Sequence, residues 1–126
     1  MAATEVRRYS AQARSTDTFG RVLCSARTQH FVVDGPAQNG CPGEALSPAE
    51  LFLAGVATCG VELLQVIATE QNLPVQQVSA TIEAVQDRGR PVRPDVSLFN
   101  SVRLEFHLRG VTAAQGTQLI ESFKRR

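Results

Sequence analysis

The 126-residue sequence lacks an excess of charge of either sign. Thirteen lysines and arginines stand against twelve aspartates and glutamates, which leaves a formal net charge of +1. A nucleic-acid-binding domain usually presents a clustered basic surface, so the composition argues against a nucleic-acid partner. The basic end, Lys124 to Arg126, is more simply the last turn of a helix, where the helix dipole favours positive charge.

The chain also lacks a long hydrophobic run. Its most apolar stretch, Leu51 to Val61, covers about eleven residues, whereas roughly twenty are needed to cross a bilayer. The N-terminus, MAATEVRRYS, has no apolar core of the kind found in signal peptides. We therefore expect a soluble protein that is neither secreted nor bound to a membrane.

Cysteines are few and follow no metal-binding pattern. Three thiols, Cys24, Cys41 and Cys59, cannot all pair within one chain, and they form neither a CxxC motif nor a ligand cluster with His30 and His107. We expect unpaired thiols, no metal site and a cytoplasmic location, because the cytosol is reducing.

The patterning that is present indicates one α+β domain over residues 1–126. β-forming or alternating segments predict strands, and a capping box of Thr112 with Gln115 opens a last helix that runs to the C-terminus. The predicted strands cover 5–10, 20–27, 29–34, 75–86 and 101–110. Strands grouped before and after a helix, rather than in regular alternation with helices, favour antiparallel sheets.

The longest predicted element is a helix with an explicit start. Ser47 is the N-cap, Pro48 takes the first helical position and Glu50 completes a capping box; the end is expected near Asn72. No polar stripe interrupts its apolar residues before Glu62, so the helix needs cover on every side. The remaining elements are too few to supply that cover, and we expect a second copy to do so in a homodimer with a large apolar interface.

Cys59 lies about three turns inside this helix, where a free cysteine is most often a packing residue. A reactive thiol would need a nearby cation, because the helix dipole helps little so far from the N-terminus. Arg14 and Arg21 are the available cations, and Glu50 could orient either one through a bidentate ion pair. From composition and spacing alone, two ordinary surface charges and a helix cap are the better explanation of these three side chains.

The motif SPAELFLAGVATC at residues 47–59 carries a resemblance. Together with the glycine-rich loop after FVVDGP and the later segments VSATIEAVQD and SVRLEFHLRGVTAAQGTQLIESF, it resembles the OsmC-like subgroup of the OsmC/Ohr superfamily, the osmotically inducible and organic hydroperoxide resistance proteins. The resemblance implies an intertwined homodimer of α+β subunits. Antiparallel sheets would surround a long buried central helix, with active sites at the dimer interface.

Better-known members of that superfamily reduce organic hydroperoxides and hydrogen peroxide with two cysteines, the first activated by an arginine and a glutamate. By this resemblance Cys59 is the attacking thiol, and Arg14 takes the place of the arginine, with Arg21 as the alternative. Glu50 would be the glutamate, displaced by one position because Ala49 directly follows the proline.

The second cysteine of the superfamily usually follows the last helix. The sequence reaches Arg126 without it, so the domain is expected to lack this C-terminal segment. Cys41, in the loop before the long helix, is then the possible substitute for the resolving thiol, and Cys24, on a strand, is the weaker one.

Three functional hypotheses remain. The leading one is a thiol-dependent peroxidase that acts on a small-molecule hydroperoxide without a cofactor and is reduced by an external thiol or dithiol. The alternative is a catalytically poor dimeric domain that binds a small apolar ligand at its interface, with Cys59 as packing. A Cys-His acyl-transfer enzyme would require His30 or His107 beside Cys59, for which the sequence gives no reason.

Overall fold

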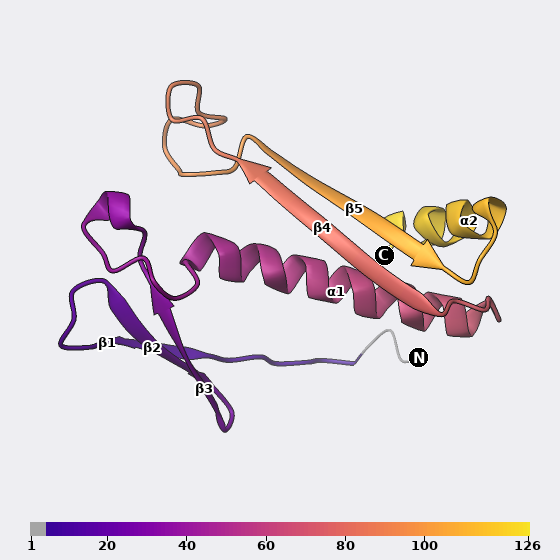
Figure 1. Ribbon diagram of the computed structural model, residues 1–126, viewed down its shortest axis with the longest axis horizontal. Coiled ribbons are helices and arrows are strands. Elements are labelled where there is room, and N and C mark those ends of the chain that lie inside the picture. Colours follow the sequence, from indigo (N-terminus) through magenta and orange to yellow (C-terminus); the bar gives the residue numbers. More distant parts are fainter. Residues whose placement is uncertain (1–4) are drawn as a thin grey trace. The chain divides into compact units, whose positions relative to one another are not determined.

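The computed structural model describes residues 5–126, and the chain divides into two compact units that meet between Leu51 and Phe52. Three strands and a short 3-10 helix precede a long helix, and two further strands precede a second helix (Figure 1). All strand pairs are antiparallel. The α+β class expected from the sequence is confirmed.

The first unit contains a three-stranded sheet in the order β1-β2-β3. The strands are β1 (Gln12–Ser15), β2 (Arg21–Ala26) and β3 (Gln29–Asp34). β2 and β3 form an antiparallel hairpin, and the strands predicted at 20–27 and 29–34 are confirmed. The edge strand predicted at residues 5–10 is wrong, because β1 lies further along the chain, on the short polar segment QARS.

The segment between β3 and the long helix is a loop that contains one 3-10 turn, Ala37–Asn39. The helix α1 (Pro48–Glu70) then begins at the predicted capping box. Glu50 donates its backbone N–H to Ser47 Oγ at 3.2 Å, and its carboxylate Oε1 accepts the Ser47 N–H at 2.9 Å. These two bonds satisfy backbone donors that a helix start leaves unpaired.

The second unit is built on the hairpin of β4 (Gln77–Val85) and β5 (Ser101–Arg109), drawn as two long arrows in Figure 1. These strands pair over nine positions, from Gln77 with Arg109 to Val85 with Ser101. The helix α2 (Ala113–Lys124) follows, with the predicted capping box of Thr112 and Gln115 formed.

The core of the second unit joins the two helices to the inner face of that hairpin. Leu64, Ile67 and Ala68 of α1 are buried together with Leu119 of α2. Phe106 of β5 and other partly buried side chains of the hairpin pack against this cluster. Alternation along β4 and β5 therefore orients the apolar side chains toward the helices, as the sequence pattern predicted.

Only one side of α1 is buried by the described chain. Its buried residues all lie after Cys59 and belong to the core side, whereas Phe52, Val56 and Val66 are 60%, 37% and 36% exposed. By length and composition α1 is also apolar enough to cross a membrane, which the eleven-residue estimate did not anticipate. The core helix of a soluble protein meets the same criterion. Contact with another apolar surface would stabilise the exposed apolar side of α1.

Candidate functional site

Cys59 is the most exposed of the three free thiols. It lies on α1 in the second unit and is exposed, whereas Cys24 and Cys41 are half-buried. Val56 precedes it by three residues and Phe52 by seven, which places all three on one side of the helix. The thiol therefore lies on the apolar side of α1 that the described chain leaves open.

Glu50, in the first unit, is already engaged as the helix cap. The hydrogen bond from the Ser47 backbone N–H lowers the pKa of the Glu50 carboxyl, and the Ser47 side chain adds to this effect. The group is therefore a carboxylate at neutral pH. Because the cap uses Oε1, the second carboxylate oxygen remains able to accept a hydrogen bond from an arginine.

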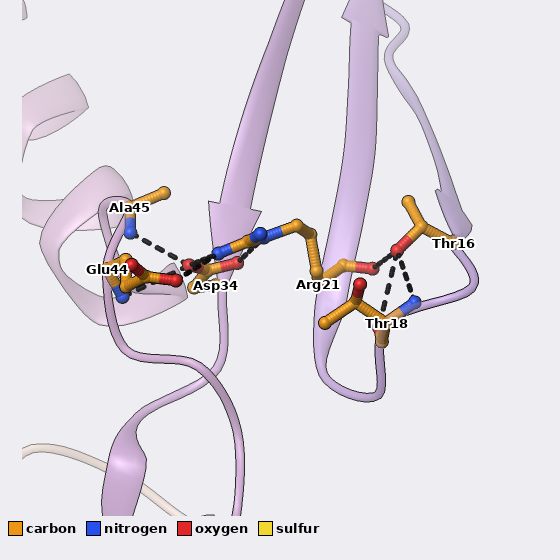
Figure 2. A network of polar contacts seen from close by, with 6 residues as sticks. All are labelled: Thr16, Thr18, Arg21, Asp34, Glu44 and Ala45. Atoms are coloured by element: carbon orange, nitrogen blue, oxygen red, sulfur yellow. Dashed lines mark hydrogen bonds and ion pairs between the residues drawn. The ribbon is translucent and has the colours of Figure 1, made fainter.

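Arg21 is held by two carboxylates of its own unit (Figure 2). Its Nε and Nη2 each donate to the Asp34 carboxylate at 2.9 Å, and Nη2 also donates to Glu44 Oε1 at 2.9 Å. The hydrogen bond with Asp34, followed by that with Glu44, raises the pKa of the guanidinium above its usual value. The positive charge of Arg21 is thus already compensated.

Asp34 is the fully buried centre of this network. Besides Arg21 it accepts the backbone N–H groups of Glu44 and Ala45 at 3.1 and 2.8 Å, through Oδ2. Arg21 first and the Ala45 N–H second hold the pKa of the Asp34 carboxyl well below its usual range. A buried carboxylate requires such compensation, and here it fastens the loop before α1 to the end of β3.

Arg14 differs from Arg21 because its guanidinium has no polar partner within residues 5–126. It stands opposite Leu23 in the sheet, is exposed, and lines a hollow of about 220 Å³ together with Gln12, Ser25 and His30. Cross-strand partners share a face of a sheet, so the register brings Arg14 and His30 to one face. This neighbourhood could not be predicted from sequence patterns, because it depends on the pairing of three strands.

Cys41, the possible substitute for the resolving thiol, is half-buried in the loop before α1. Its side chain fills a space over Gly20 and Gly35, where a Cβ at either glycine would collide with the Cys41 Sγ. Gly20 also has a φ of 80°, a conformation that favours glycine. Cys41 therefore contributes to the packing of its loop.

The remaining candidates show no catalytic constellation. His107 lies on the exposed face of β5, 3.4 Å from the carboxylate of Glu105. Within residues 5–126 no group of three or more histidine, cysteine, aspartate or glutamate side chains is placed to hold a metal ion. Arg14, Arg21, Glu50 and Cys41 belong to the first unit and Cys59 to the second.

Comparison with known proteins identifies relatives at the level of family and fold. A family model described as OsmC-like protein matches residues 41–126. A comparison with curated proteins gives no significant match.

Several solved structures have the same fold. An OsmC-like protein from Mycoplasma pneumoniae is 12% identical, with a TM-score of 0.79 over 95% of this chain and 82% of that one. An organic hydroperoxide resistance protein from Legionella pneumophila is 23% identical, with a TM-score of 0.73 over 95% and 84%. Another from Elizabethkingia anophelis is 20% identical, with a TM-score of 0.71 over 97% and 84%. At these identities the likeness shows the fold alone.

The Asp34 network makes the stability of the protein depend on pH. Because the folded pKa of Asp34 lies below the unfolded value of about 3.9, its contribution is present above that value and is lost as pH falls below it. We expect Asp34→Asn to lower the melting temperature by at least about 5 °C at pH 6. The difference from the parent should shrink steadily between about pH 5 and pH 2.

The matched control is Asp95→Asn, which removes a carboxylate from an exposed ion pair with Arg93 and should change the melting temperature little. If the melting temperatures of the parent and of Asp34→Asn differ by the same amount across this pH range, the pH dependence does not come from Asp34.

Proposed function

Because the chain belongs to the OsmC-like protein family, whose model matches residues 41–126, we propose that it is a thiol-dependent peroxidase with Cys59 as the reacting thiol. The observation that carries the proposal is the position of Cys59, the exposed thiol on the open apolar side of α1. Solved structures of the same fold include proteins named for organic hydroperoxide resistance, which supports organic hydroperoxides as the substrate class. Hydrogen peroxide is the smaller alternative substrate of the same proposed chemistry.

The proposed chemistry needs only the thiolate, the peroxide and a reducing thiol. The Cys59 thiolate attacks one peroxide oxygen, a sulfur–oxygen bond forms and the O–O bond breaks. The other oxygen leaves with the electron pair and takes up a proton, which gives an alcohol or water. The peroxide gains two electrons and the sulfur becomes a sulfenic acid. No cofactor takes part.

Re-reduction is assigned to an external thiol or dithiol. The first thiol displaces water from the sulfenic acid and forms a disulfide, which a second thiol then reduces by exchange. Cys41 could supply the first thiol only if its loop moved, because its side chain is packed over Gly20 and Gly35. Cys24 is half-buried on the central strand of its sheet.

Arg14 is the proposed activating cation. A thiol deep in a helix gains little from the helix dipole and needs a neighbouring positive charge. Arg21 is compensated by Asp34 and Glu44, whereas Arg14 has no polar partner in the described part of the chain. In this proposal the free carboxylate oxygen of Glu50 orients the guanidinium of Arg14.

The protein is proposed to act as an intertwined homodimer with its sites at the interface. Phe52, Val56 and Val66 leave one side of α1 apolar and open, and a second copy is the partner that would cover it in both subunits alike. Three unpaired thiols also favour the reducing cytoplasm as its location.

The first prediction concerns Cys59. In a single turnover with an organic hydroperoxide, the parent should consume about one equivalent per subunit and gain one oxygen atom at Cys59, seen by mass spectrometry of the digested protein. Cys59→Ser should abolish rapid consumption, whereas Cys24→Ser and Cys41→Ser serve as matched controls and should retain the first turnover. Consumption by Cys59→Ser at the parent rate would make this thiol a packing residue and favour the binding of an apolar ligand instead.

The second prediction separates the two arginines. Arg14→Gln should slow the reaction of Cys59 with peroxide at least about tenfold, because the thiolate loses its cation, and should leave the melting temperature nearly unchanged. Arg21→Gln should lower the melting temperature, because it leaves Asp34 buried without its partner. A normal peroxide rate in Arg14→Gln would remove this residue from the mechanism.

The third prediction concerns the open side of α1. In a monomer an aspartate at the exposed Val56 would meet water, but in the proposed dimer it would bury an unpaired charge. We therefore expect Val56→Asp to dissociate or unfold the protein at micromolar concentration, measured by analytical ultracentrifugation. Val92→Asp, in the exposed loop between β4 and β5, is the control and should leave the dimer intact. A parent protein that sediments as a folded monomer would refute the proposed assembly.

A further inference from the structure

The peroxidase chemistry proposed for Cys59 needs a proton for the departing oxygen. When a thiolate breaks the O–O bond of an alkyl hydroperoxide, that oxygen carries the negative charge of an alkoxide until a proton reaches it. An alkoxide is a strong base and therefore a poor leaving group. A positioned proton donor accelerates such steps by roughly 10²- to 10⁴-fold, so the identity of the donor affects the rate strongly.

The two charged residues proposed for this site cannot supply that proton. A guanidinium keeps its protons in proteins, so Arg14 can stabilise negative charge but cannot act as the acid. The Ser47 backbone N–H lowers the pKa of the Glu50 carboxyl, so Glu50 has no proton to give at neutral pH. Histidine is the side chain whose charge changes between about pH 5 and 8, and the chain has two, His30 and His107.

His30 shares a hollow with Arg14. Both line the space of about 220 Å³ on the three-stranded sheet, together with Gln12, Leu23 and Ser25. Arg14 pairs with Leu23, whereas Gln12 pairs with Ser25 and Ser25 with His30. Alternate residues and cross-strand partners share a face of a sheet, so these five side chains lie on one face. All five belong to the first unit, which forms this hollow by itself.

The imidazole of His30 is free to exchange a proton. It is exposed and has no polar partner within residues 5–126. Among the residues that line the hollow, Arg14 is the one other ionisable side chain, and none is acidic. No carboxylate in the hollow therefore holds a proton on His30. His107 differs, because it lies on the other sheet with its Nε2 3.4 Å from the Glu105 carboxylate.

We propose that His30 is a catalytic residue, the general acid that protonates the departing alkoxide while the organic substituent occupies the hollow beside Leu23. As the sulfur–oxygen bond forms, the electron pair of the broken O–O bond takes a proton from the imidazolium. The products are the sulfenic acid, an alcohol and a neutral imidazole, which regains its proton from solvent. The inference rests on the proposed function, in which Arg14 stands beside the Cys59 sulfur.

The test compares two oxidants with different leaving groups in a single turnover with Cys59. Cumene hydroperoxide releases an alkoxide, whereas peracetic acid releases acetate, which needs no proton. At about pH 6, where imidazole side chains are largely protonated, we expect His30→Gln to slow consumption of cumene hydroperoxide at least about tenfold. Consumption of peracetic acid should slow by at most about twofold, and the melting temperature should stay nearly unchanged because the position is exposed.

Two further variants separate proton transfer from other effects. Arg14→Gln should slow both oxidants, because the thiolate loses its cation whichever group departs. His107→Gln is the matched control and should leave both rates unchanged, since this histidine lies on the other sheet.

The pH profile with cumene hydroperoxide gives a second readout. The rate of the parent should rise as the thiolate forms and fall again as the imidazolium loses its proton. His30→Gln should lose the fall at higher pH, which a purely structural role of His30 would not produce.

Equal slowing of both oxidants by His30→Gln would place its effect on the thiolate and overturn the role in proton transfer, as would an unchanged rate with cumene hydroperoxide. Either result leaves the peroxidase function intact, because the parent still consumes peroxide through Cys59. If the parent consumes neither oxidant, or if Cys59→Ser consumes both at the parent rate, the peroxidase function is rejected and the role of His30 with it.

Discussion

The requirement to bury the apolar surface of α1 governs most of this structure. The second unit meets it on one side, where Leu64, Ile67 and Ala68 join the core with α2 and the inner face of the β4–β5 hairpin. Gly60 contributes to this burial, because the absence of a side chain leaves room for the ring of Phe106 against the helix. The side with Phe52 and Val56 stays largely exposed, although the Phe52 ring lies 6.2 Å from that of Phe99. Burial of such surface is a major source of folding and association free energy.

The first unit is organised by charge more than by apolar burial. Asp34 is fully buried and accepts four hydrogen bonds, two from Arg21 and two from backbone N–H groups. A buried carboxylate without a partner would strongly destabilise the fold. Loss of the ion pair with Arg21 would therefore lower the stability of the first unit. Arg21 is therefore not available to a second group, whereas Arg14 has no polar partner among residues 5–126.

The elements whose signals are local could be predicted from the sequence. Both capping boxes are short motifs that specify a helix start, and the alternation of residues 101–109 specifies a strand with one buried face. The strand β1 escaped prediction because QARS has only one apolar residue and shows no alternation. Its pairing with β2, rather than its own composition, makes it a strand.

The arrangement of the candidate site was less predictable, because it depends on contacts between distant residues. Arg21 and Asp34 are thirteen positions apart and meet only through the register of β2 and β3. Cys41 lies in a loop rich in glycine and proline, yet its side chain is packed, because Gly20 and Gly35 leave room for it. Loop composition indicates where the backbone turns, but it does not reveal which side chain fills the space that the turn creates.

In the proposed dimer, two opposing requirements would meet at Cys59. Cover for the open side of α1 would remove water from the thiol, and an apolar environment alone disfavours a thiolate. The same exclusion of water strengthens the attraction between a thiolate and a cation. A covering surface that carries both apolar side chains and an uncompensated arginine would satisfy the two requirements together. Among the described residues, Arg14 is such an arginine, so in the proposed dimer one contact between copies would both stabilise the helix and activate its thiol.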